Sequence, residues 1–241
     1  MRSSSHCYSG LGVSFILKIA HIDAGQDFRG GQDLLLSLAR GLKQRGHRQV
    51  IVCPEGSALA ERAARVEAAR AGVHVDLVQA RIEDLPGDIG QFHAVTIGRA
   101  LHWFDRDEAL AVLDRIVAPH GWIAICGTRT FGAAMHGWNG TFHEIRRAWS
   151  SDPDESRYHI DFAEWFRGSR FRKVEDVEVT ESQQVSISDL IGRALSMSTT
   201  SPEALGDRRP GFEAALHEAL EPLATEGVFD EQITAVAMIL R

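Results

Sequence analysis

Strand-like and helix-like segments alternate through the first half of the sequence, and this alternation constrains the fold more than any other feature. Short apolar runs that end at glycine, proline or aspartate predict buried strands. These runs cover residues 15–22, 49–53, 73–79, 92–97 and 122–126. Segments with helical periodicity lie between them at residues 32–43, 57–71 and 105–116. Strands that alternate with helices favour a parallel sheet with helices on both faces, so we expect an α/β fold.

Local signals mark the ends and faces of these helices. Ser57 is a fair N-cap residue for the second helical segment, and Asp105 opens the third. Gly46 is expected to end the first segment. One apolar face of that segment, which we expect to pack on the sheet, carries Leu34, Leu35, Leu38 and Leu42.

The pattern changes after about residue 130. Residues 130–170 are rich in aromatic side chains in helix-like pieces, and residues 174–185 alternate in a way that predicts a long strand. Helices are expected at residues 187–197 and 211–224, and a final apolar strand at residues 233–240. One domain over residues 14–241 is the economical interpretation, preceded by a leader at residues 1–13 that we expect to be disordered.

Composition and charge exclude several classes of function. The net charge is −7 without a dense run of Lys or Arg, so nucleic acid is not an expected partner. The three cysteines form no CxxC pair and the eleven histidines show no HExxH spacing, so we expect no metal. The sequence has no long apolar segment and no signal peptide, so we expect a cytoplasmic protein without membrane contact. We also expect a monomer or homodimer.

Three motifs arrive in order at spacings typical of one family. They are ARIEDLP at residues 80–86, FHAVTIGRALHWFD at residues 92–105 and IVAPHGW at residues 116–122. Over residues 72–241 the chain resembles the class I S-adenosylmethionine-dependent methyltransferases called type 11. The resemblance implies a Rossmann-like sheet of seven mostly parallel strands, with the last strand antiparallel and paired with residues 174–185 near one edge. It also implies helical cap elements within residues 130–170 and 187–230, and methyl transfer to a small-molecule substrate.

The resemblance also suggests a role for each candidate site residue. The S-adenosylmethionine cofactor would be bound by Asp23, Gly25, Glu55, Ile82, Glu83, Asp84, Gly98 and Ala100. Trp103 offers an aromatic face to the sulfonium, and His102 could accept a proton from the substrate. Substrate contacts are assigned to Arg99, Trp138 and His143. For each the alternative is structural: Glu83 and Asp84 as a solvated turn, Trp103 and Trp138 as core, and Arg99 as a surface residue.

The front of the chain departs from the family pattern. Asp27 and Arg29 stand where the family has glycines, and Cys53 stands where it has a ribose-binding acid. These departures predict weak cofactor binding. Residues 17–63 instead resemble the amino-terminal lobe of two-lobed (GT-B) glycosyltransferases, on the stretches AHIDAG, RGGQ and CPEGSALA. The two resemblances together imply a mosaic join near residues 63–75. The alternatives to a methyltransferase are therefore a degenerate methyltransferase-fold binding protein without activity and a glycosyltransferase fragment.

Overall fold

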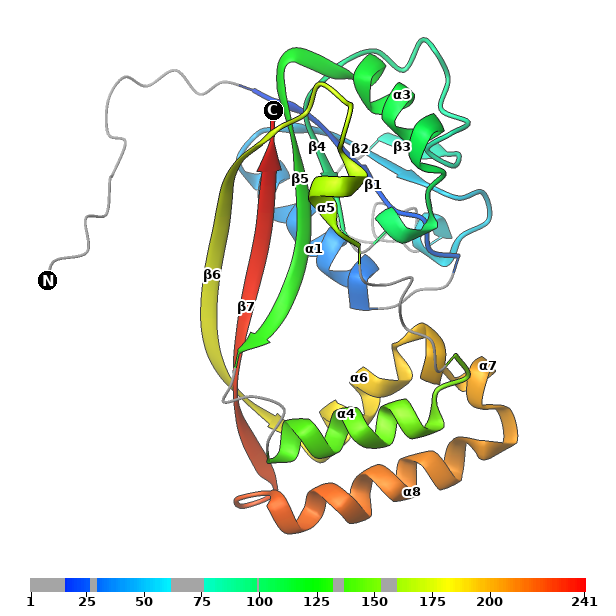
Figure 1. The fold of residues 1–241 in the computed structure, drawn as a ribbon, viewed down its shortest axis with the longest axis vertical. Coiled ribbons are helices and arrows are strands. Elements are labelled where there is room, and N and C mark those ends of the chain that lie inside the picture. Colours follow the sequence, from blue (N-terminus) through cyan, green and yellow to red (C-terminus); the bar gives the residue numbers. More distant parts are fainter. Residues whose placement is uncertain (1–15, 27–29, 62–75, 99, 132–136, 153–159) are drawn as a thin grey trace, which may run out of the picture.

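A computed structural model describes residues 16–26, 30–61, 76–98, 100–131, 137–152 and 160–241 (Figure 1). Across these residues seven strands form one sheet in the order β3-β2-β1-β4-β5-β7-β6. The strands are β1 (Lys18–Ile22), β2 (Arg48–Cys53), β3 (Asp76–Gln79), β4 (Phe92–Ile97), β5 (Val117–Phe131), β6 (Lys173–Ser186) and β7 (Val228–Leu240). The first five are parallel, whereas β7 runs antiparallel to both β5 and β6. The expected fold class is therefore confirmed, including the pairing of the last two strands at one edge.

The helices follow the sequence pattern with small shifts at their ends. They are α1 (Gly30–Gln44), α3 (Arg106–Ile116), α4 (Trp138–Trp149), α5 (Phe162–Trp165), α6 (Ile187–Leu195), α7 (Pro202–Leu205) and α8 (Arg209–Leu220). As expected, Asp105 caps α3, and its side chain accepts a hydrogen bond from the backbone N–H of Glu108 at 3.0 Å. The expected leader at residues 1–13 and the mosaic join at residues 63–75 lie outside the described residues.

Two hydrophobic clusters hold helices against opposite faces of the sheet. On one face α3 and the segment around Trp165 and Phe171 cover the apolar side chains of β1, β2, β4 and β5. On the other face Leu35 and Leu36 of α1 pack near Ile51 and Cys53 of β2. The α1 face predicted from the sequence was wrong in part, because Leu34 is 52% exposed and Leu38 is 38% exposed. α1 therefore buries a narrower face than the one that carries Leu34, Leu35, Leu38 and Leu42.

A chain of buried polar groups crosses the sheet beneath α1. The ring of His21 in β1 is fully buried, with Nδ1 2.7 Å from the Thr96 hydroxyl and Nε2 2.8 Å from the Gln49 side-chain oxygen. The Gln49 amide in turn donates to the backbone carbonyl of Ala39 in α1 at 2.8 Å. The chain joins β4, β1, β2 and α1 by hydrogen bonds that satisfy each buried side chain.

Beyond the parallel part of the sheet, β5, β6 and β7 extend to a separate layer of helices, α4, α6, α7 and α8 (Figure 1). This layer has its own hydrophobic cluster, which includes Phe142, Leu190, Phe212 and Phe229. An ion pair fastens it to the sheet: the guanidinium of Arg193 in α6 donates to both oxygens of Glu231 in β7, at 2.6 and 2.7 Å. The last strand begins at Val228, five residues before its predicted start, because its antiparallel pairing with β6 continues to that point.

Candidate active site

The carboxyl ends of the parallel strands define the candidate site. The arrow of β5 points toward the helical layer, and β1, β2 and β4 run in the same direction (Figure 1). The loops that follow these strands therefore face the layer. Open α/β sheets bind ligands outside the carboxyl ends of their strands, so the cofactor residues suggested by the sequence lie at the edge where a ligand is expected.

The loop after β1 is closed by a side chain from α1. Both carboxylate oxygens of Asp23 accept hydrogen bonds from the side-chain amide of Gln32, at 2.9 and 3.0 Å, and one also accepts from the Gly25 N–H at 3.0 Å. Burial raises the pKa of Asp23 above its usual value, although these hydrogen bonds act in the opposite direction. A Cβ added to Gly25 would meet the Gln32 amide nitrogen at 2.4 Å. Glycine is therefore required at this position for the Gln32 contact, and not only for the approach of a ligand.

The end of β2 presents a buried thiol. Cys53 is fully buried beside Leu59 and Ala60, and burial raises the pKa of its thiol, with the nearby charge of Asp23 adding to the effect. The Ser57 hydroxyl accepts from the Ala60 N–H at 3.3 Å, as expected of an N-cap. Glu55 is exposed in the turn between them. Glu55 is therefore the accessible acidic side chain of this turn, whereas the strand end itself is occupied by a buried thiol.

The turn after β3 supports its neighbours. Ile82 is buried in the sheet core, and Asp84 is exposed. The Glu83 side chain is 5% exposed, lies 3.3 Å from the guanidinium of Arg81, and accepts the backbone N–H of Asp105 at 2.9 Å. Glu83 thus positions the residue that caps α3. This contact joins two of the sequence motifs through a hydrogen bond that the sequence did not indicate.

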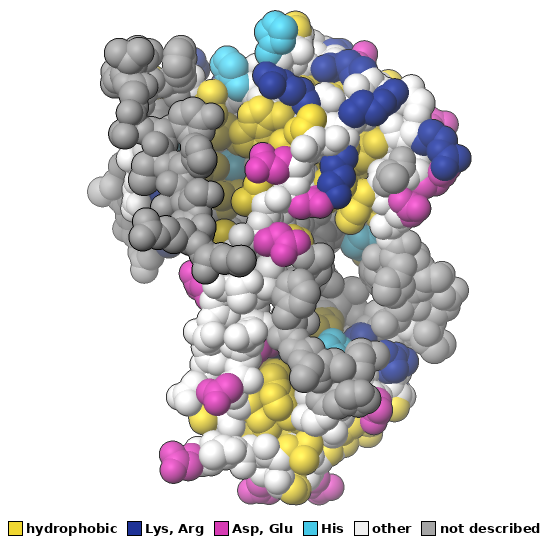
Figure 2. Space-filling view, turned by 60° about the vertical axis from the view of Figure 1, so that its left-hand side comes forward, with side chains coloured by type: hydrophobic (Ala, Val, Ile, Leu, Met, Phe, Trp, Pro, Cys, Tyr) yellow, Lys and Arg dark blue, Asp and Glu magenta, His cyan; other side chains and the backbone are white. Residues whose placement is uncertain are grey.

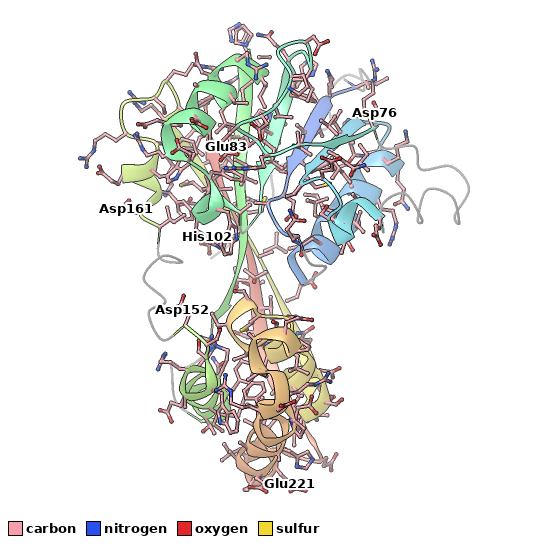
Figure 3. All side chains as sticks on the ribbon, turned by 90° about the vertical axis from the view of Figure 1, so that its right-hand side faces the viewer. Asp76, Glu83, His102, Asp152, Asp161 and Glu221 are labelled. Carbon is pink, nitrogen blue, oxygen red and sulfur yellow. The ribbon has the colours of Figure 1, made fainter. Side chains whose placement is uncertain are left out.

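The turn after β4 carries the most accessible groups of the site. Gly98 is exposed and has open space where a Cβ would lie, whereas Ala100 is buried. A single 3₁₀ turn, Leu101–Trp103, then presents two rings with centroids 4.8 Å apart, those of His102 and Trp103. Trp103 is 48% exposed. In Figure 3 the labelled His102 lies on the side of the sheet region that faces the helical layer, with Asp152 across from it.

The proposed substrate residues are less closely grouped. Arg99 lies outside the described residues. Trp138 stacks on Phe229, with ring centroids 5.0 Å apart, and packs against the core of the helical layer. His143, on the same helix, is half-buried with its ring at the edge of Phe142. The contacts of Trp138 are those of a core residue, which was the alternative weighed from the sequence.

Arginine side chains line surface depressions beside α3. Two such depressions lie where Arg106 donates to the carbonyl of Trp165 and Arg170 donates to that of Val117. These arginines hold the segment that includes α5 onto α3. The described part of the chain contains no group of three or more His, Cys, Asp or Glu side chains that could hold a metal. None of its helices is long and apolar enough to cross a membrane.

Comparisons with known proteins agree with this architecture. Residues 35–125 match a family model described as a methyltransferase domain. A candidate type II methyltransferase from Anaeromyxobacter dehalogenans superposes with a TM-score of 0.53 at 19% identity, over 92% of this chain and 88% of that one. The MccD protein superposes with a TM-score of 0.50 at 13% identity, over 93% of this chain and 90% of that one. The fold is therefore that of Rossmann-like methyltransferases. No curated protein matches the chain.

The comparisons give no support to the resemblance of residues 17–63 to a glycosyltransferase lobe. The methyltransferase match begins at residue 35, within α1, and takes in the rest of that helix, β2 and the turn around Cys53. In addition, β1 and β2 belong to the same continuous sheet as the later strands. The front third of the described chain is thus part of one methyltransferase-like sheet.

Proposed function

We propose that this chain binds S-adenosylmethionine at the carboxyl ends of β1, β2 and β4 and transfers its methyl group to a small molecule. The observation that carries the proposal is the β4 turn. Trp103 is 48% exposed, Gly98 has open space where a Cβ would lie, and both lie within the segment that matches a methyltransferase domain. When bound, the cofactor supplies an electrophilic methyl group on a positively charged sulfur.

The donor set of the edge fits this cofactor at its cationic end. The face of an aromatic ring attracts a cation, and Trp103 presents such a face with about half of its side chain accessible. Asp23 and Glu55 are the carboxylates of the β1 and β2 turns, and either could accept a hydroxyl or ammonium donor of the cofactor. Glu83 has a supporting role, because it holds the Asp105 backbone and thereby the start of α3.

His102 is the residue best placed to act on the methyl acceptor. Its ring is half-buried next to Trp103, so it could accept a proton from an oxygen or nitrogen that is being methylated. Methyl transfer also proceeds by alignment and exclusion of water, so the proposal does not require a base. Arg99 is assigned to bind a carboxylate of the substrate.

A second candidate is a methyltransferase-fold protein that binds the ligand without catalysis. It is favoured by Gln32, which occupies the space beside Gly25, and by the buried Cys53. Both features reduce the contacts available to the amino-acid and ribose parts of the cofactor. Binding of S-adenosylmethionine without turnover on any acceptor would support this candidate.

Titration calorimetry with S-adenosylmethionine, S-adenosylhomocysteine and a nucleotide sugar tests the proposal. Trp103→Ala should weaken binding of S-adenosylmethionine by about threefold to thirtyfold, the range expected for loss of a cation–π contact, and Trp103→Phe should weaken it less. The uncharged S-adenosylhomocysteine should lose less affinity in Trp103→Ala. Phe162→Ala, which removes another exposed aromatic ring, is the matched control. Binding of the nucleotide sugar alone, or equal affinity in all variants, would refute the proposal.

A further inference from the structure

Asp23 lies directly after β1, at the sheet edge where the cofactor is proposed to bind. Its side chain is half-buried, and the donors that reach it among the described residues are neutral groups of the protein. The surface acids of the molecule differ from it, because in Figure 2 acidic side chains in magenta lie close to Lys and Arg side chains in dark blue. The neutral donors around Asp23 therefore decide what else can bind to its carboxylate.

The protein's own donors fill the Asp23 carboxylate. The side-chain amide nitrogen of Gln32 lies 2.9 Å from one carboxylate oxygen and 3.0 Å from the other. The backbone N–H of Gly25 donates to the second oxygen at 3.0 Å, and the backbone N–H of Ala24 also donates to the carboxylate. A carboxylate has about four acceptor positions. A further donor can therefore bind to Asp23 only after one of these contacts is released.

The Gln32 contact is the one that can be released most easily. The N–H groups of Ala24 and Gly25 belong to the same loop as Asp23, so they leave the carboxylate only if the loop backbone changes. Gln32 instead reaches the carboxylate from the first turn of α1, through a side chain with rotatable bonds. Its amide nitrogen also lies 2.4 Å from the position of a Cβ added to Gly25. Rotation of this one side chain would uncover both the carboxylate and the glycine.

An ammonium group is the kind of donor that can displace this amide. A hydroxyl would exchange one neutral donor for another, so it would gain nothing over Gln32. An ammonium group adds the attraction between opposite charges, which is stronger at a half-buried carboxylate than in water. Burial also raises the pKa of Asp23, and a cation beside the carboxylate would act in the opposite direction. The hydroxyl groups of a ribose are then left to Glu55, which is exposed in the turn after β2.

We propose that Gln32 is a latch on Asp23, which opens when the ammonium group of a ligand's amino-acid part replaces the Gln32 amide. This inference rests on the proposed function, because S-adenosylmethionine carries such a group. In the empty site the latch satisfies a half-buried carboxylate that would otherwise lose hydrogen bonds. Gln32 thereby reserves Asp23 for a cationic donor, and it weakens the binding of every ligand that must displace it.

Titration calorimetry on the full chain with three ligands tests the latch. S-adenosylmethionine and S-adenosylhomocysteine carry the amino-acid part, and methylthioadenosine lacks it. Gln32→Ala should bind the first two at least about tenfold more tightly than the wild type, because a hydrogen bond to a charged group no longer has to be broken. Its affinity for methylthioadenosine should not change. Gln184→Ala is the matched control and should leave all three affinities unchanged, because Gln184 also donates to an aspartate, Asp230, but lies in β6 outside the candidate site.

A second measurement follows the latch in the wild type, so it decides the proposal even if Gln32→Ala does not fold. In a nitrogen–proton NMR spectrum the side-chain amide resonance of Gln32 should move on saturation with S-adenosylmethionine and stay in place with methylthioadenosine. A resonance that does not move, equal or weaker binding of S-adenosylmethionine by folded Gln32→Ala, or equally tightened binding of methylthioadenosine would each overturn the latch and leave the proposed function intact. Failure of all three ligands to bind either chain would overturn the proposed function, and the latch with it.

Discussion

Acidification should destabilise this protein through His21. The ring is fully buried, and burial lowers its pKa below the usual 6.5, against the opposing effect of the Gln49 hydrogen bond. Because the Gln49 amide donates to Ala39, its oxygen must accept from His21 Nε2, and Nδ1 of the neutral ring accepts from the Thr96 hydroxyl. Protonation at Nδ1 would make the Thr96 hydroxyl an acceptor and would place a positive charge in a fully buried site. Burial therefore favours the neutral ring in the folded protein.

The sign and size of the effect follow from proton linkage. Below pH 6.5 the unfolded chain binds a proton at this histidine that the folded chain does not bind, so the free energy of unfolding falls as the pH falls. The contribution is fully present above pH 6.5 and is lost toward the lowered folded pKa. One proton corresponds to about 1.4 kcal/mol per pH unit, so the loss between pH 7.5 and 5.5 is at most about 1.4 kcal/mol, or about 3–5 °C in Tm, the limit reached when the folded ring stays neutral throughout.

Urea unfolding at a series of pH values, compared between the wild type and His21→Gln, measures this contribution. Glutamine can still bond to both neighbours but does not titrate, and the opposite contribution of Asp23, whose pKa is raised by burial, is common to both chains. The free energy of unfolding of the wild type should fall more steeply below pH 6.5. Thr96→Val provides a second check, since it leaves Nδ1 without its donor and should cost about 1–3 kcal/mol at pH 7.5. Equal pH dependence in wild type and His21→Gln would refute the reasoning.

Two further predictions concern burial of charge. Cys53→Asp should lower the Tm of thermal unfolding by more than about 5 °C, because burial of an unpaired carboxylate in an apolar cluster beside Asp23 costs several kcal/mol. Cys53→Ala should cost only about 1 kcal/mol. Equal Tm values for the two variants would show that position 53 is accessible to water. Arg193→Ala should reduce the free energy of unfolding, measured in urea, by about 2–3 kcal/mol, because it leaves the fully buried Glu231 carboxylate without its cation. This loss is smaller than for a fully buried pair, because the Arg193 side chain is 30% exposed. Glu231→Gln in the same chain should recover part of the loss, and no recovery would contradict the role of this ion pair.

The Arg193 prediction also has a pH component. Burial acts to raise the pKa of Glu231, but the hydrogen bonds from Arg193 and Gln183 hold it below its usual value. A carboxyl with a lowered pKa contributes stability above its unfolded pKa, and this stability is lost as the pH falls toward the folded value. The contribution of Glu231 therefore begins to fall below pH 4.5, whereas that of His21 begins to fall below pH 6.5.

Much of the architecture could be predicted because local patterns and tertiary structure agree. The apolar run at residues 92–97 became β4 with the expected bounds, and Asp105 caps α3 as its position indicated. Residues 174–185 alternate in sequence and lie in the edge strand β6, where side chains of both faces are accessible. In these segments the local pattern of apolar, polar and capping residues agrees with the tertiary structure, so the sequence was sufficient to predict them.

The face of α1 and the extent of β5 depended on partners that are distant in sequence. The helical periodicity placed Leu34, Leu35 and Leu38 on one apolar face. The sheet beneath α1 contacts Leu35 but leaves Leu34 and Leu38 exposed. β5 was predicted at residues 122–126 and extends over Val117–Phe131, because β7 continues to pair with it as far as Phe131 and Gln232. Periodicity indicates that a face is apolar and does not indicate how much of it another element will cover.

The candidate site shows the same limit at the level of single side chains. A motif places a residue at a strand end, but competing hydrogen bonds decide whether its side chain faces a ligand or the protein. Glu83 was assigned to the cofactor by position, yet its carboxylate accepts the backbone of Asp105, 22 residues away. Gln32, which the sequence placed only in the RGGQ stretch, has its side-chain amide in the space beside Gly25. Among the described residues of this edge, Glu55, Asp84, Gly98 and Trp103 are accessible, whereas Ile82, Ala100 and the Cys53 side chain are buried.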